Sequence, residues 1–212
     1  MIKANQELAS PHHLPICFLS HCSVSDLVGK RVPVFADKAL GDYVTKGYFA
    51  NADISLDSVD GVAVPNFPRM WSSFAEGTAD VAIVVVGAGN SREFDATFGI
   101  KYLSFDDSDA ALQRMRKFLP QTYTQEMPAG SVPGIDVPTN VNVFDYTLFA
   151  GKDVSEDMVY KAVKSLWQNE KMALDSGPIW NGFSKEIMSK DVGVEYHPGA
   201  IKFYKEMGTW NK

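Results

Sequence analysis

The sequence predicts an α/β protein built on a doubly wound parallel sheet, followed by a partial second α/β unit that is rich in helices. Two observations predict this fold. Short β-branched runs alternate with amphipathic helical stretches over residues 30–118, the pattern of successive β-α-β units. One run, residues 80–86, is apolar at nearly every position, which is typical of a central parallel strand with both faces covered.

Composition and charge exclude several classes of protein. The 212 residues are 45% hydrophobic and 22% charged, so the chain can bury a sizeable core and is neither disordered nor fibrous. The formal net charge is -6, and Lys and Arg are scattered along the chain. This distribution predicts no nucleic-acid partner and no binding to an anionic membrane surface. No apolar stretch approaches the roughly 18 residues of a membrane span.

Four strand–helix pairs are predicted in the first part of the chain. The predicted strands cover residues 30–36, 61–65, 80–86 and 100–105. The predicted helices that follow them cover residues 39–49, 68–76, 91–98 and 110–118. Asp37 is predicted to cap the first helix, and Asp106 or Ser108 the fourth, because short polar side chains accept hydrogen bonds from first-turn N–H groups. Pro68 opens the second helix and Gly77 ends it.

The pattern changes after Pro120. Residues 120–138 are rich in Pro and Gly and predict a connector with a strand near Tyr123. One or two strands are predicted over residues 140–150. The remainder is predicted to be helical, with Ser155 as the first N-cap, over residues 157–168, 171–175, 180–190 and 199–207.

A Gly-rich turn, residues 87–91 (GAGNS), follows the most apolar strand and precedes a helix. Its glycines allow close approach, and the N-terminus of the helix carries partial positive charge, so the turn could cradle an anion. The turn matches neither GxGxxG nor a GKS/T loop, which disfavours a nucleotide. A plain tight turn and a loop facing a small ligand are the two remaining interpretations, because ligands of such sheets bind beyond the carboxyl ends of the strands.

The two cysteines are Cys17 and Cys22. A zinc site with His12, His13 and His21 is one interpretation, and two buried or idle thiols are the other.

Other polar residues are predicted to have structural roles. His197 precedes Pro198 and is expected at the start of a helix, bonded to exposed amides, rather than in catalysis. Asp145 lies in an apolar run and must reach water, a cation or a hydrogen-bond donor. Asp106 and Asp107 are expected to be helix-capping residues rather than an acid/base pair.

Three aromatic residues, Tyr43, Phe67 and Trp71, are predicted to be core residues. Aromatic side chains near strand ends also line small-ligand sites.

Several segments resemble the TAXI group of TRAP-transporter solute receptors. They are SDLVGKRVPV, EGTADVAIVVVGAG, PAGSVPGIDVPTNVNVFDYTLFA, DMVYKAVKSLW and EYHPGAIKFYKEMG. The last segment is the most specific, because it matches the closing helix of that family at His197, Pro198, Gly199, Ala200, Tyr204, Glu206 and Gly208. The resemblance extends over residues 25–210.

The resemblance implies a type II periplasmic-binding-protein fold, in which two α/β lobes close on a small solute. It implies no cofactor, metal or catalytic residue, and a periplasmic protein that passes an organic anion or an amino acid such as glutamate to membrane permease subunits. Receptors of this family begin with an export signal and a first lobe, and we expect this sequence to lack both. The domains implied are an N-terminal segment (1–24), an intact lobe (25–136), and crossover strands with C-terminal helices of an incomplete lobe (137–212). Self-association would cover the incomplete lobe.

The same resemblance implies ligand-binding residues at strand ends and at the hinge. They are Ala36, Asp37, Lys38, Asn66, Phe67, Gly87, Ala88, Gly89, Thr139 and Asn140. Lys38 would pair with a ligand carboxylate, and Asn66 would hydrogen-bond to it. Two other functions remain open: an enzyme on the same scaffold that uses His197 or Asp145, and a cytosolic ligand-sensing or interaction domain.

Overall fold

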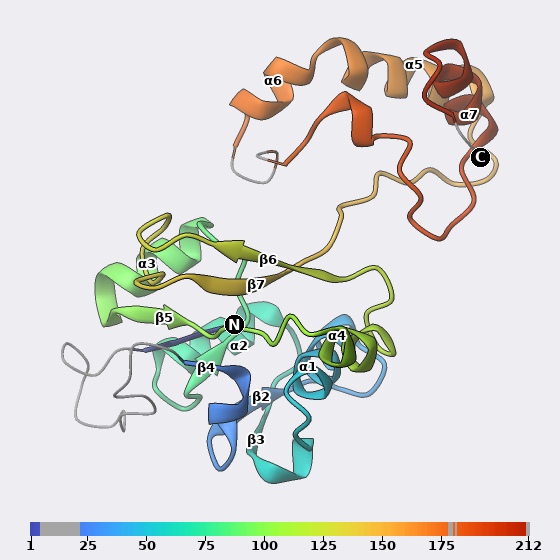
Figure 1. Ribbon diagram of the computed structural model, residues 1–212. Coiled ribbons are helices and arrows are strands. Elements are labelled where there is room, and N and C mark those ends of the chain that lie inside the picture. The colour runs from blue at the N-terminus through green and yellow to red at the C-terminus, as the bar shows by residue number, and fades with distance from the viewer. Residues whose placement is uncertain (5–21, 178–179, 181, 211–212) are drawn as a thin grey trace. The chain divides into compact units, whose positions relative to one another are not determined.

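The computed structural model describes residues 1–4, 22–177, 180 and 182–210 (Figure 1). The chain divides into two compact units, Met1–Phe144 (unit 1) and Asp145–Lys212 (unit 2). Unit 1 combines strands with covering helices, whereas the described part of unit 2 holds helices and connecting segments. The predicted mixed α/β class is confirmed at this level. Strand 139–143 belongs to unit 1, so unit 1 extends beyond residue 136.

The strands of unit 1 do not form the predicted uninterrupted parallel sheet. Strands β2 (Arg31–Val34) and β3 (Asp60–Ala63) are parallel and pair in full register. Strand β1 (Ile2–Ala4) lies antiparallel between β4 (Val81–Ala82) and β5 (Ile100–Tyr102). A backbone hydrogen bond of 2.9 Å from Asp80 to Arg31 links β4 to β2. The prediction is therefore wrong about one central strand, which comes from the start of the chain.

Strand β4 is much shorter than the predicted strand 80–86. Val81 and Ala82 are fully buried, as expected for a central strand, but Val85 is 51% exposed. Beyond Ala82 the backbone bonds to a helix instead of a strand: the Ile83 N–H lies 3.4 Å from Met70 Sδ, and Ile83 O accepts from Trp71 Nε1 at 2.9 Å. Because these bonds replace ladder bonds, the sheet ends early and the apolar run continues as a loop.

Four helices of unit 1 follow these strands in the predicted order. They are α1 (Leu40–Asn51), α2 (Phe67–Ala75), α3 (Gly89–Phe98) and α4 (Asp109–Arg116). Ser108 caps α4, since its Oγ accepts the Ala111 N–H, while Asp106 Oδ1 accepts the Ser108 N–H at 2.8 Å. Short 3₁₀ turns, Val24–Leu27 and Leu56–Ser58, complete the connections.

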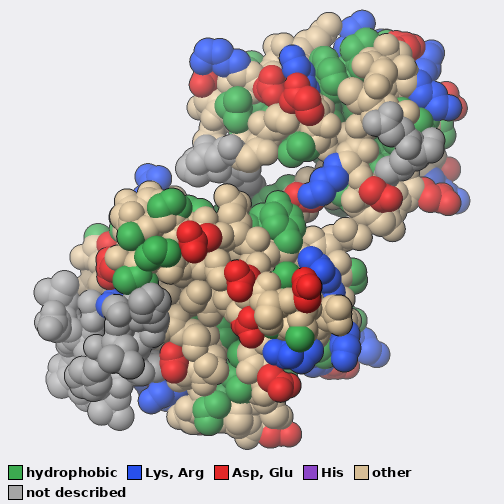
Figure 2. All heavy atoms as spheres, in the orientation of Figure 1, with side chains coloured by type: hydrophobic (Ala, Val, Ile, Leu, Met, Phe, Trp, Pro, Cys, Tyr) green, Lys and Arg blue, Asp and Glu red, His purple; other side chains and the backbone are tan. Residues whose placement is uncertain are grey.

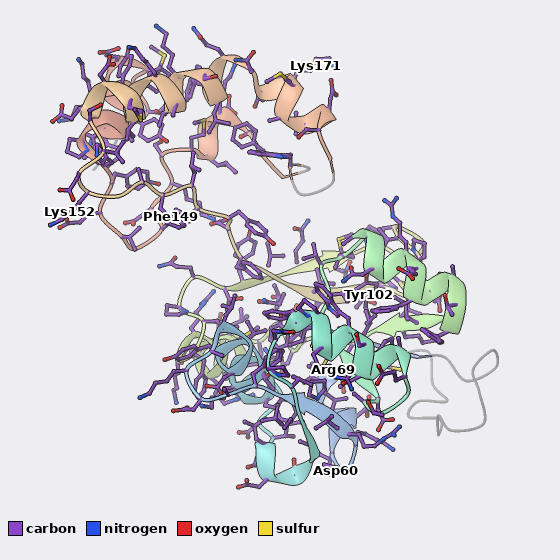
Figure 3. The ribbon with its side chains drawn as sticks, turned by 180° about the vertical axis from the view of Figure 1, so that it is seen from behind. Asp60, Arg69, Tyr102, Phe149, Lys152 and Lys171 are labelled. Atoms are coloured by element: carbon purple, nitrogen blue, oxygen red, sulfur yellow. The ribbon has the colours of Figure 1, made fainter. Side chains whose placement is uncertain are left out.

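Strands β6 (Tyr123–Met127) and β7 (Thr139–Val143) form an antiparallel pair. The strand predicted near Tyr123 is confirmed, but the one predicted over residues 140–150 ends at Val143. After β7 the chain is not a strand, and Leu148 and Phe149 are 73% and 90% exposed. Phe149 is labelled on this segment in Figure 3.

Unit 1 has two apolar clusters. One is formed by α1, α4 and the 3₁₀ turn at 24–27 and includes Leu27, Phe49 and Met115. The other is formed by β4, β5, α2 and α3 and includes Phe74 and Ile100. All five side chains are at most 3% exposed, so the strands pack against a close-packed core.

Unit 2 contains α5 (Glu156–Gln168), α6 (Glu170–Asp175), the 3₁₀ turn Lys185–Ile187 and α7 (Pro198–Glu206). The hydroxyl of Ser155 accepts the Met158 N–H and caps α5, as predicted. Helices α5 and α7 pack closely: a Cβ at Gly199 would lie 2.3 Å from Glu156 O. The helix predicted over 180–190 is wrong, since the described residues of this range form no α-helix and include the 3₁₀ turn Lys185–Ile187.

Candidate functional site

The carboxyl ends of β2 and β3 bring two loops of unit 1 together. Val34 and Ala63 are register partners at the last positions of these strands, so the loops that follow start side by side. The next residues maintain this contact, because the rings of Phe35 and Phe67 have centroids 5.0 Å apart. Such an aromatic contact contributes about 0.5–1.5 kcal/mol beyond area burial. Loops 35–39 and 64–66 therefore form one edge of the unit.

The loop after β4 joins the same edge. Its first residue is held to α2 by the hydrogen bond between Trp71 Nε1 and Ile83 O. Phe67, the first residue of α2, lies 6.4 Å from Trp71 between ring centroids and touches Phe35 on its other side. Residues 35–39, 64–67 and 83–89 are called the carboxyl edge below. In doubly wound sheets this is the edge at which ligands bind.

The first predicted binding loop holds an internal ion-pair network. Ala36, Asp37 and Lys38 are exposed, and the Lys38 N–H donates to Asp42 Oδ2 at 2.9 Å. Lys46 Nζ pairs with Asp42 at 2.8 Å and with Asp37 at 3.2 Å. Asp37 does not cap α1 as predicted: Ala39 holds that position and makes no side-chain cap bond. The carboxylate of Asp42 lies in the first turn of α1 instead.

Burial and hydrogen bonding act in opposite directions on Asp42. Burial tends to raise the pKa of this carboxyl, whereas hydrogen bonds from Lys46 Nζ and the Lys38 N–H lower it, and the net pKa is lower than usual. The N-terminus of α1 is thus already neutralised by a carboxylate of its own helix. Lys38, with φ of +65°, keeps an exposed side chain that belongs to none of the described ion pairs.

The second predicted loop has a capping role that the sequence analysis did not assign to it. Asn66 Oδ1 accepts the Arg69 N–H at 2.9 Å and so caps α2. Phe67 is partly buried against Phe35 and Trp71, so the predicted core role of Phe67 and Trp71 is confirmed in part. Tyr43 is 43% exposed, and its predicted core role is wrong.

The third predicted loop is only partly exposed, since Gly87 is buried, Ala88 is half-buried and Gly89 is exposed. Gly87 is buried with φ of +72°, a backbone conformation that favours glycine, and it turns the chain into α3. Ala88 is the N-cap residue and offers no side-chain acceptor. Gly89 begins the helix, and nothing lies within 4 Å of the position that a Cβ would take.

Thr139 and Asn140 lie on β7 and are bonded away from the carboxyl edge. Thr139 is 3% exposed and donates to Val137 O at 2.8 Å. Asn140 uses its backbone: its N–H donates to Ser104 Oγ at 3.1 Å, and its carbonyl accepts from Phe105. Thr139 also lines a small cavity of about 20 Å³, room for one water molecule. No described hydrogen bond or ring contact joins this pair to the other predicted site residues.

The remaining candidates are tied into the fold. His197 caps α7: its Nδ1 accepts the Gly199 N–H at 3.2 Å, and its Nε2 lies 3.0 Å from Val154 O. This confirms the predicted structural role and leaves neither ring nitrogen for acid/base chemistry. Asp145 accepts a hydrogen bond from Lys190 Nζ at 2.7 Å. Lys190 is a cation, one of the kinds of partner predicted for this carboxylate. Asp145 lies beyond β7 rather than within a strand.

Cys22 is disulfide-bonded, so its interpretation as an idle thiol is wrong. The other residues of the proposed zinc site, Cys17, His12, His13 and His21, lie outside the described residues. Within the described ranges no group of three or more His, Cys, Asp or Glu side chains is placed to hold a metal ion.

Sequence reasoning missed Tyr102 near the carboxyl edge and gave Ser91 no role beyond its place in the Gly-rich turn. Ser91 in α3 is 2% exposed, and Tyr102 at the end of β5 is 5% exposed. Tyr102 is labelled in Figure 3. The sequence offers little indication of a special role for Tyr102, because the residue lies in a run of apolar and polar residues that is typical of an ordinary strand.

Acidic and basic side chains are interspersed on the face shown in Figure 2. Among the described residues, no helix is both long and apolar enough to cross a lipid bilayer. An α/β unit with three loops gathered at the carboxyl ends of its strands is an architecture suited to binding a small solute.

A comparison with known protein families also indicates a solute-binding protein. The NMT1-like family model matches residues 19–208, and the chain belongs to the NMT1-like family, a solute-binding family of the periplasmic-binding-protein type.

Proposed function

We propose that this protein is the solute-binding component of a TRAP-type transport system of the TAXI group, and that it captures a small organic anion or an amino acid such as glutamate. The observation that carries the proposal is the contact between Phe35 and Phe67, which joins two binding loops at the carboxyl edge. Membership of a solute-binding family supports the same role. The protein would perform no chemistry.

The proposed mechanism is selection of a closed state by the solute. A solute that contacts the closed form more extensively shifts the equilibrium toward that form, by no more than its difference in affinity for the two states. The closed form would then be recognised by membrane permease subunits. In this type II receptor arrangement, unit 1 would form one lobe and residues 145–212 would belong to the other.

The proposed location is the periplasm. Family membership supports it, and so does the disulfide at Cys22, because disulfides persist in oxidising compartments and are rare in the cytosol.

A thermal-shift screen tests the proposed function. The purified chain would be melted in the presence of amino acids, dicarboxylates and other small organic acids, with sugars and nucleotides as comparison classes. Binding to the folded state must raise the melting temperature in a concentration-dependent way. We expect a shift with one class of acids or amino acids. A cooperative melt with no shift from any solute would contradict the proposal.

A further inference from the structure

The hydroxyl of Tyr102 is an orphaned buried group. Among the described residues it is the one buried side-chain polar atom that lacks a hydrogen-bond partner. Tyr48 is a natural comparison, because both tyrosines are 5% exposed, yet Tyr48 Oη accepts from Asn142 Nδ2 at 3.3 Å. Buried polar groups are nearly always hydrogen-bonded, so an orphan calls for an explanation in terms of function or ligand.

The polar groups nearest to the Tyr102 hydroxyl belong to the start of α3. They are the Ser91 side chain and the Gly87 backbone. Neither is in hydrogen-bond geometry with Tyr102 Oη. The Ser91 hydroxyl donates its hydrogen to Ala88 O at 2.8 Å. Burial raises the pKa of Tyr102 above its usual value. The phenol is therefore protonated at neutral pH and carries an O–H that can be donated.

The first turn of α3 supplies further donors. Ala88 caps it without a side-chain acceptor, and within the described residues the N–H groups of Gly89 and Asn90 have no acceptor. In α1 the Asp42 carboxylate lies in the first turn and accepts the Lys38 N–H, and in α2 the Asn66 amide oxygen accepts the Arg69 N–H. Open space lies in front of Gly89. Unsatisfied N–H groups and the helix dipole together favour an acceptor oxygen there.

We propose that Tyr102 Oη and the first turn of α3 form the subsite that holds one carboxylate group of the solute. The proposal rests on the proposed solute-binding function and assigns a specific anchor within it. The carboxylate would accept hydrogen bonds from the N–H groups of Gly89 and Asn90, and the Tyr102 hydroxyl, which lies next to Ser91 and Gly87, would donate to it. The nearby Asp95 carboxylate, which accepts the Ile100 N–H, adds negative charge and disfavours a dianion such as phosphate.

Acetate is the probe for this subsite, and two tyrosine variants separate binding from structure. In ¹H–¹⁵N NMR titrations of the wild type, acetate is expected to shift the amides of Gly89 and Asn90, and phosphate to shift them less. Tyr102→Phe is expected to weaken acetate binding by about tenfold or more without lowering the melting temperature, because the hydroxyl has no internal partner to lose. Tyr48→Phe is expected to lower the melting temperature and to leave acetate affinity unchanged.

A second variant keeps the test independent of Tyr102. Gly89→Pro removes one donor at the first helical position, where proline fits because that N–H has no partner within the helix. Ala88, with φ of −67° and ψ of 163°, already has the extended conformation required before proline. Weaker acetate binding is expected.

Unchanged acetate affinity in Tyr102→Phe, or wild-type shifts that avoid α3, would overturn the subsite. If other solutes still raise the melting temperature, the proposed function would stand and only the subsite would fall. Acetate shifts at α3 with no response to any solute would instead retain the subsite and contradict the function.

Discussion

Phe35 and Phe67 follow two neighbouring parallel strands, and their rings meet at a centroid distance of 5.0 Å and an interplanar angle of 48°. Phe35 is 5% exposed and lies directly beneath Gly41 of α1. One aromatic contact thus ties the loop after β2 to the start of α2, while Gly41 leaves room for the ring. The position of the carboxyl edge depends on this packing.

Gly41→Ala tests the packing directly. A Cβ at this position would lie 2.4 Å from the Phe35 ring, so the ring or the helix must move. We expect a loss of about 1–3 kcal/mol in the free energy of unfolding, as is typical of overpacking. Urea unfolding measures it. The matched control is Gly89→Ala, where a Cβ meets nothing within 4 Å, and equal destabilisation by the two variants would contradict the account.

Asn66→Ala removes the cap of α2. Because Asn66 Oδ1 accepts the Arg69 N–H, we expect the free energy of unfolding to fall by about 1 kcal/mol. Asn66→Asp keeps an acceptor oxygen and should recover most of the loss in the same urea experiment. A full loss in Asn66→Asp would show that the side chain acts through a different contact.

The free energy of unfolding should fall at high pH, because the buried phenol of Tyr48 resists ionisation in the folded state. Burial raises the pKa of Tyr48 to about 12, an effect that the Asn142 hydrogen bond partly offsets. The pKa of an unfolded tyrosine is about 10, so the folded state favours the protonated phenol. This contribution is fully present below pH 10 and is lost as the pH rises through 12.

Urea unfolding at pH 8, 10 and 11 would compare wild type with Tyr48→Phe. The variant should be less stable at pH 8, and the difference should shrink as the pH rises. Burial also raises the pKa of Tyr204 in unit 2 to about 12. Tyr204 is present in both proteins, so its contribution to the pH dependence cancels in the comparison. A constant difference across the series would contradict the assignment.

Self-association remains a prediction, and the segment after β7 offers a test of it. Phe149 is 90% exposed, and Phe149→Ser should change stability by no more than about 0.5 kcal/mol. If the segment contributes to association, the variant should shift sedimentation velocity toward the monomer at micromolar concentration. Wild-type protein that sediments as a monomer would rule out association in this range.

Local signals allowed much of the fold to be predicted. Ser108, Ser155 and His197 lie where caps were expected, because a cap depends on residues within one turn. Strand β1 could not be predicted, since its pairing with β4 and β5 joins residues about 80 to 100 positions apart. Strand β4 was predicted too long, because contacts from α2 end the ladder at Ala82.

The candidate site was predicted less fully than the fold. Three of the four groups of predicted binding residues lie along the carboxyl edge, because strand ends define that edge in any parallel arrangement. Thr139 and Asn140 are instead bonded near β5. The acceptor role of Asn66 and the orphaned hydroxyl of Tyr102 depend on three-dimensional neighbours that no spacing in the sequence reveals.

The most direct test of the account is an amide-shift map of unit 1 with a solute found in the thermal screen. We expect the largest shifts at residues 36–38, 66–67 and 87–89. The opposite edge of the strands provides the control, through Gly29, Ser58 and Gly77, where the Gly29 N–H donates to Ser58 O and Arg31 Nη1 to Gly77 O. Shifts concentrated at that opposite edge, with none at the carboxyl edge, would contradict the central claim.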